Sequence, residues 1–117
     1  MSRHIDLGKK GEEWAIAWLT QRGYEILHRN WRQGRYEIDV IARRQGIYHF
    51  IEVKCRKTKR YGPPETSVTP RKLSNMMQAA TGWLTRLQSK PRIQFDVLSV
   101  TTGPSGPDCL LFEDVYV

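Results

Sequence analysis

Three acidic residues and one lysine occur on two neighbouring segments that have the alternation of β-strands. Glu37 and Asp39 lie in the sequence YEIDVIA, and Glu52 and Lys54 lie in HFIEVKC. Because alternate side chains of an extended chain share a face, Glu37 is expected beside Asp39, and Glu52 beside Lys54. Carboxylates are the ligands that hard divalent cations prefer, and such cations promote phosphodiester hydrolysis. The pattern therefore predicts a nuclease-type metal site.

The same residues also have a purely structural interpretation. They could form cross-strand ion pairs on a solvated face, each contributing less than about 1 kcal/mol. A spacing of Asp followed by Glu-x-Lys is common by chance, so the context has to decide. Glu12 supplies context, because on a helical wheel it lies inside the apolar arc of its helix, and a buried acid needs a partner. We expect Glu12 to point toward the same site.

The remaining sequence predicts the elements that position these residues. Apolar spacing and a closing glycine indicate a first helix, and Thr69-Pro70 begins a second helix as N-cap and first-turn proline. The expected order is a helix at 7–22, a short strand at 24–27, a turn at 30–34, strands at 36–42 and 49–55, a loop at 56–68, a helix from 69 to 89, and strands at 93–100 and 109–117. A helix between two strands implies a parallel pairing. We expect one α/β domain over residues 1–117, with a small mixed β-sheet flanked by α-helices.

Composition favours a polyanionic partner. The chain has 117 residues, with 19 Lys and Arg against 12 Asp and Glu, and a formal net charge of +7. We expect a mobile basic loop, at about 56–68, to contact the phosphate backbone of a nucleic acid, although a solvated loop tip would have the same composition. The predicted contact residues are Arg56, Lys57, Lys59, Arg60 and Lys72.

Other classes of protein are disfavoured. Cys55 and Cys109 are far apart, and the three histidines show no metal-ligand spacing, so structural zinc is not expected and His28 and His49 are taken as structural. No apolar run is long enough to span a membrane. These features predict a soluble cytoplasmic protein without a membrane partner.

Several motifs resemble a known family. The run Gly8-Lys9-Lys10-Gly11-Glu12 is followed by Gly23-Tyr24, Glu37-Ile38-Asp39-Val40-Ile41-Ala42, Glu52-Val53-Lys54-Cys55-Arg56 and Phe95-Asp96-Val97. Together they resemble the YraN-like family of predicted endonucleases, which is similar to the archaeal Holliday junction resolvases of the restriction-endonuclease-like, PD-(D/E)xK, superfamily. The resemblance implies a restriction-endonuclease-like core with a four-stranded mixed sheet. It also implies that Asp39, Glu52 and Lys54 are the active-site signature and that Glu12 is the acid carried by the helix.

The mechanistic hypothesis combines both arguments. Asp39, Glu52 and the Val53 carbonyl would hold Mg²⁺ or Mn²⁺, and Lys54 would orient the attacking water or neutralise the transition state. Glu37 and Glu12 would be outer ligands or supports. The substrate would be DNA recognised by shape, such as branched or junction DNA, and a homodimer is expected only by analogy with resolvases. The alternatives are a non-catalytic nucleic-acid-binding module and an accessory protein of a repair or recombination assembly.

Overall fold

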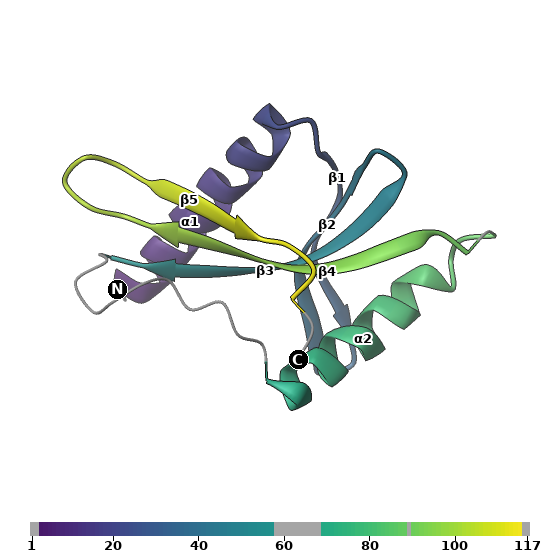
Figure 1. The fold of residues 1–117 in the computed structure, drawn as a ribbon. Coiled ribbons are helices and arrows are strands. Elements are labelled where there is room, and N and C mark those ends of the chain that lie inside the picture. Colours follow the sequence, from purple (N-terminus) through teal and green to yellow (C-terminus); the bar gives the residue numbers. More distant parts are fainter. Residues whose placement is uncertain (1–2, 58–68, 89, 116–117) are drawn as a thin grey trace.

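A five-stranded mixed sheet with one helix on each face forms the protein, which was analysed as a computed structural model (Figure 1). The structure describes residues 3–57, 69–88 and 90–115. The elements are α1 (Arg3–Gln21), β1 (Glu25–Gln33), β2 (Tyr36–Arg44), β3 (Ile47–Arg56), α2 (Pro70–Leu84), β4 (Arg92–Thr101) and β5 (Asp108–Phe112). The expected α/β fold with a small mixed sheet flanked by helices is thus confirmed. The sheet has five strands, where the family resemblance implied four.

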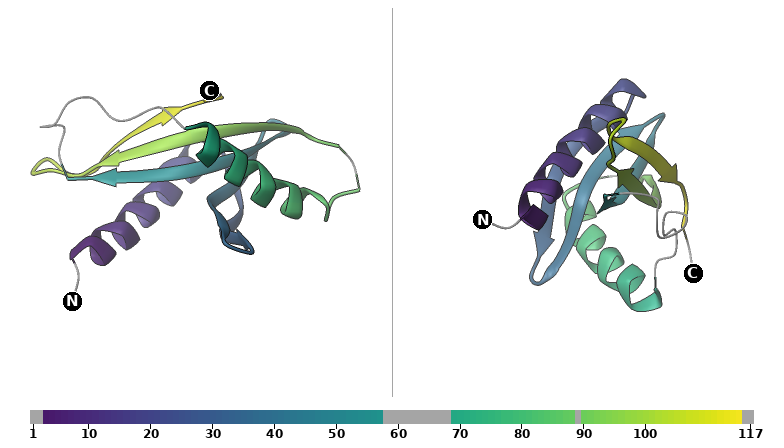
Figure 2. Two further views of the ribbon diagram at one scale, coloured as in Figure 1. Left: turned by 90° about the horizontal axis from the view of Figure 1, so that it is seen from below. Right: turned by 90° about the vertical axis from the view of Figure 1, so that its left-hand side faces the viewer.

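The strands lie in sequence order, β1-β2-β3-β4-β5. The pairs β1–β2, β2–β3 and β4–β5 are antiparallel, and β3–β4 is parallel. The parallel pair is the one expected from a helix placed between strands, because α2 connects β3 to β4. Figure 2 shows the resulting arrangement, with α1 and α2 on opposite sides of the sheet.

Two apolar clusters hold the helices against the sheet. The cluster under α2 includes Met76 and Trp83 of the helix together with Phe50 of β3. The cluster under α1 includes Leu19 of the helix together with Val40 and Ile51. The sheet therefore buries residues on both of its faces.

Most helix termini follow the sequence signals. Gly23 has φ of 87°. The amides of Gly23 and Tyr24 donate back to Thr20 and Leu19 at 3.1 Å, which is a Schellman end for α1. Thr69 caps α2 as predicted, since its hydroxyl oxygen accepts from the amide of Lys72 at 3.1 Å. The predicted end of this helix at residue 89 is wrong, because α2 ends at Leu84. Beyond it the chain turns more tightly, with Leu87 N donating to the Leu84 carbonyl.

The first strand is longer than its sequence indicates. The segment 30–34 is not a turn: β1 continues to Gln33, and only Gly34 and Arg35 connect it to β2. Asn30 has φ of 54°, which a short polar side chain tolerates inside a strand. The hairpin between β2 and β3 is tighter than expected, because Gln45 and Gly46 alone form it, with φ of 52° and 78°.

Candidate functional site

Strand β2 changes its side-chain alternation at Asp39. Ile38 packs in the cluster under α2, whereas Val40 packs in the cluster under α1, although residues two apart in a regular strand share a face. The β2–β3 ladder also ends here, since its last pair is Val40 with Ile51. Period-two reasoning from the sequence therefore fails at Asp39, and a local irregularity aims this side chain.

Asp39 takes the place of a strand partner for β3. Its Oδ2 accepts a hydrogen bond from the Val53 amide at 2.8 Å, so an amide left without a ladder partner is satisfied by a carboxylate. The Val53 carbonyl as a metal ligand stays a prediction. This contact fixes the Asp39 carboxylate beside Val53 of β3, the residue that lies between Glu52 and Lys54 in the sequence.

Burial and three neighbouring carboxylates define the electrostatics. Burial is the main cause that raises the pKa of Asp39 to about 6; the Val53 hydrogen bond opposes it, and the charges of Glu52, Glu37 and Glu12 raise it further. The structure therefore brings together the four acids singled out from the sequence. We call Glu12, Glu37, Asp39 and Glu52 the acidic cluster.

Glu52 is largely buried and is paired with a lysine. Its side chain is 16% exposed, and its Oε1 accepts from Lys72 Nζ at 2.8 Å. Its second oxygen, Oε2, is buried and has no hydrogen-bond partner among the residues that the structure describes. A buried carboxylate oxygen without a donor is costly, so this atom is a place where a cation would fit.

Helix α1 supplies Glu12 through a close contact with β3. Gly11 is buried, and a β-carbon at this position would overlap the Cys55 sulfur. The helix can approach the strand this closely only because residue 11 is glycine. Burial is the main cause that raises the pKa of the Cys55 thiol, and the charge of the nearby Glu12 raises it further. The charge of Glu12 also raises the pKa of Asp39. Glu12 thus lies close enough to affect Asp39 electrostatically, and the predicted direction of its side chain stays a prediction.

The other predicted site residues have different surroundings. Glu37 pairs with Arg32 at 3.3 Å, with side chains 36% and 72% exposed. Lys54 is half-buried, on the same strand as Glu52, and its predicted role stays untested. The solvated ion-pair interpretation describes the Arg32–Glu37 pair, but it does not describe Asp39 or Glu52, which are partly or largely buried.

Lys72 occupies a position that the sequence does not indicate. It was predicted to contact the nucleic-acid backbone, and the structure places it in the first turn of α2 against Glu52. Its hydrogen bond to Glu52 raises the pKa of the Lys72 ammonium, so it stays charged beside the acids. The capping contact of Thr69 with the Lys72 amide is the local reason for this placement.

The predicted basic loop is described only at its start. Arg56 belongs to β3, and its carbonyl accepts from the Thr102 amide at 2.8 Å, so the loop begins later than residue 56. Lys57 is exposed. Lys59 and Arg60 lie outside the described residues, as does most of the predicted segment 56–68. Contact of these residues with nucleic acid stays a prediction.

Comparison with known proteins gives the family. Residues 11–100 match the Uncharacterised protein family UPF0102. The chain belongs to this family. It is 41% identical to a UPF0102 protein of Symbiobacterium thermophilum over 99% of this chain and 98% of that protein. It is 44% identical to a UPF0102 protein of Cytophaga hutchinsonii over 84% and 87%, and 37% identical to one of Phocaeicola vulgatus over 86% and 83%.

The family spans the residues that form the site. The matched range of UPF0102 contains Glu12, Asp39, Glu52 and Lys72, and it ends within β4. Within the described residues, neither helix has the length and apolar character needed to cross a membrane. The site is therefore part of the region shared with the family.

Proposed function

We propose that this UPF0102 protein is a divalent-metal-dependent nuclease that hydrolyses phosphodiester bonds in DNA. The observation that carries the proposal is the buried Glu52 Oε2, which has no donor within residues 3–57, 69–88 and 90–115, beside an Asp39 whose pKa is raised to about 6. Lys72 pairs with Glu52 and Arg32 pairs with Glu37, but burial and the neighbouring carboxylates still disfavour the ionised form of Asp39. A divalent cation bound by these oxygens would offset that repulsion.

The chain's own residues fit such a cation. Asp39 and Glu52 would hold it through hard oxygen atoms, which suits Mg²⁺ or Mn²⁺. The bound ion would supply Lewis acidity and an activated water for attack on phosphorus. Glu12 and Glu37 would support these ligands from α1 and β2. Lys72 would keep Glu52 oriented, and Lys54 would neutralise charge that develops on the phosphate oxygens.

The basic residues around the site favour DNA as the partner. The chain carries a formal net charge of +7, although four of its 12 acidic residues lie together in the acidic cluster. Arg56 and Lys57 follow the site directly along β3, and Lys59 and Arg60 come next in the sequence. Contacts of these side chains with phosphates would give affinity without base sequence, so recognition would depend on the shape of the DNA, such as a branch or junction.

The test is Mn²⁺-dependent cleavage of linear, flapped and four-way DNA by the wild type, Asp39→Asn and Glu52→Gln. We expect both variants to lose nicking and to keep DNA affinity within a few-fold, because metal ligation and phosphate contact use different residues. Glu25→Gln is the matched control, since it removes one exposed carboxylate that pairs with Arg43 away from the site. Equal cleavage by all four proteins would overturn the catalytic assignment. DNA binding without cleavage by any of them would favour a non-catalytic binding module.

A further inference from the structure

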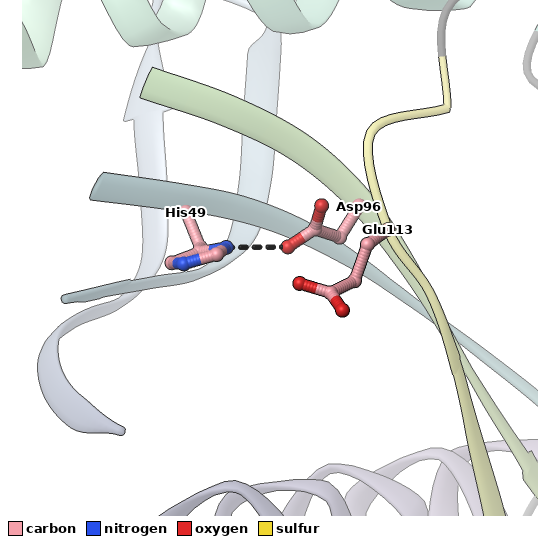
Figure 3. Close-up of side chains that lie close together, drawn as sticks. All are labelled: His49, Asp96 and Glu113. Carbon is pink, nitrogen blue, oxygen red and sulfur yellow. Dashed lines mark hydrogen bonds and ion pairs between the residues drawn. The ribbon is translucent and has the colours of Figure 1, made fainter. Parts of the chain in front are cut away.

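A second group of metal-ligating side chains lies on three neighbouring segments of the sheet. His49 comes from β3, Asp96 from β4 and Glu113 from the residue just after β5. One ligand atom from each lies within 4.8 Å of the others. Figure 3 shows the Glu113 carboxylate below that of Asp96, and a dashed line joins Asp96 to the His49 ring at the left. None of these residues belongs to the acidic cluster.

The framework around these side chains is well supported. The parallel β3–β4 register pairs His49 with Gln94 and Ile51 with Asp96. The segment after β5 is attached to β4 by two amides, since Asp114 N donates to Asp96 Oδ1 at 2.9 Å and Val115 N donates to the Phe95 carbonyl at 2.9 Å. Asp96 is fully buried, and His49 is 4% exposed. The backbone therefore brings Glu113 over a buried His-Asp pair.

The charges in this group do not balance. His49 Nδ1 and Asp96 Oδ2 are 2.7 Å apart. Gln94 Nε2 donates to Asp96 Oδ1 at 3.0 Å and to Glu113 Oε1 at 3.1 Å, so one neutral amide bridges two carboxylates. The nearby cation Arg44 lies over the Tyr24 ring, 5.0 Å from its centroid. Within the described part of the chain, the partners of these two carboxylates are thus one imidazole, the Gln94 side-chain amide and the Asp114 backbone amide, and the carboxylates repel each other where water is partly excluded.

We propose that His49, Asp96 and Glu113 bind a transition-metal ion of the Zn²⁺ class. One imidazole nitrogen and two carboxylate oxygens are a donor set that Zn²⁺ accepts, whereas Mg²⁺ prefers oxygen alone. Three protein ligands leave a fourth position for water. The ion would take the place of the proton between His49 Nδ1 and Asp96 Oδ2.

The hydrogen bonds around the ligands suit this role. Asp96 Oδ1 is held by Gln94 and by the Asp114 amide, which leaves Oδ2 directed toward His49. Such contacts to the second oxygen orient a ligating carboxylate. Ligand atoms around tetrahedral Zn²⁺ lie about 3.3 Å apart, as its bond lengths of about 2.0 to 2.1 Å require. The His49–Asp96 pair would open by a fraction of an ångström, and the exposed Glu113 side chain would close on the ion.

This proposal does not depend on the proposed nuclease function. His49 and Glu52 are three positions apart in β3, so their side chains project from opposite faces. His49 packs edge-to-face on Tyr24, which follows α1, while Glu52 contacts Lys72 of α2. The two sites also differ in chemistry, because the acidic cluster offers only oxygen. Metal selectivity can therefore separate them.

The test is titration of the metal-free full-length protein with Co²⁺, followed by visible absorption, and with Zn²⁺, followed by melting temperature and by displacement of Co²⁺. We expect the wild type and the Asp39→Asn/Glu52→Gln variant to bind, with equal affinity, one ion that millimolar Mg²⁺ does not displace. Glu113→Gln and His49→Asn should weaken binding at least about 10-fold. In His49→Asn the new side chain still offers a hydrogen-bond donor to Asp96. In Glu113→Gln the new side chain still offers an oxygen to the Gln94 amide.

Asp114→Asn is the matched control. It removes the neighbouring exposed charge, and Asn tolerates the φ of 56° at this position, so Co²⁺ affinity should not change. Glu113 is exposed, so Glu113→Gln remains informative even if His49→Asn does not fold. If Glu113→Gln binds Co²⁺ as the wild type does, the proposal is overturned. Absence of any Co²⁺ or Zn²⁺ effect in the wild type up to about 1 mM would leave His49 and Asp96 as a buried hydrogen-bonded pair.

Discussion

Asp39 lies in an environment unlike that of an ordinary surface acid. It is desolvated, surrounded by Glu52, Glu37 and Glu12, and supported by one backbone amide. Its ionised form is therefore disfavoured in the folded protein until a cation or a proton arrives. Ionisation of Asp39 therefore costs free energy at the place where the proposed metal would bind.

The first prediction concerns pH. The folded pKa of Asp39, about 6, exceeds the ordinary value of 3.8, so between these values the folded chain keeps a proton that the unfolded chain has released. This contribution to the free energy of unfolding is full below pH 4 and is lost as pH rises through 6. Its size is on the order of 3 kcal/mol. Asp39→Asn should remove it.

Denaturant unfolding in EDTA at pH 4.5 and 7.5 measures the difference. Asp39→Asn should gain stability relative to the wild type as pH rises, since Asn still accepts from Val53 and cannot ionise. The exposed Glu25→Gln variant should show no such trend. A constant difference between wild type and Asp39→Asn at both pH values would mean that Asp39 is not perturbed.

Residue types and spacing predict the acidic cluster well, and they predict its partners poorly. Glu12 could be placed because the helical period is a local property, whereas the side-chain alternation of β2 breaks at Asp39 and does not place that residue. Lys72 could not be placed against Glu52, because only the docking of α2 creates that contact. The group of His49, Asp96 and Glu113 is separated by long stretches of chain, so no spacing rule reveals it. The charged residue Asp96 within an apolar strand was the available signal.

At the scale of elements, the contact between α1 and β3 positions the cluster. The second prediction is that Gly11→Ala destabilises the protein by about 1–3 kcal/mol, because the added methyl group would overlap the Cys55 sulfur. The thermal or denaturant transition measures this change. The double variant Gly11→Ala/Cys55→Ala should recover most of the loss, since it removes the atom that is overlapped.

Gly82→Ala provides the comparison for this prediction. A β-carbon there would meet the far end of the Gln33 side chain, which can move away at little cost. We expect Gly82→Ala to change stability by much less than Gly11→Ala. Failure of Cys55→Ala to rescue Gly11→Ala would show that the helix is limited by another contact.

Element boundaries were predictable where backbone chemistry is local. The Schellman end at Gly23 and the Thr69 cap follow directly from residue type. Strand β1 was underestimated because Asn30, a residue typical of turns, sits within it at positive φ. Helix α2 was overestimated because Leu87 continues the apolar period after the helix has ended. In both places tertiary packing overrides a local signal.

At the scale of the molecule, a basic chain carries a concentrated acidic site. With a net charge of +7, polyanions are attracted to the protein as a whole, while the acidic cluster repels phosphate unless a cation is bound. Divalent ions should therefore strengthen binding of DNA at the site itself. The net charge can be predicted from the composition, but the local excess of negative charge at the acidic cluster depends on the fold.

The central parallel pair has a consequence for the order of folding. Strands β1, β2 and β3 form a meander of near neighbours, whereas Ile47 of β3 pairs with the distant Arg92 of β4. Closing the longer loop costs more chain entropy, so the meander should form first and bring Asp39 beside Glu52 before Lys72 is docked. At this early stage the carboxylates of Asp39 and Glu52 repel each other, and the Lys72 ammonium is not yet in place to reduce the repulsion.

This order gives the last prediction, for stopped-flow folding kinetics in EDTA at pH 7.5. Asp39→Asn should accelerate folding, because it removes repulsion already present in the transition state. Lys72→Gln should mainly accelerate unfolding, because its contact with Glu52 forms late. Arg71→Gln, an exposed neighbour in the same helical turn, should alter neither rate. If Lys72→Gln instead slows folding and leaves unfolding unchanged, α2 docks before the meander is complete. Lys72 would then be in place before Asp39 and Glu52 are brought together.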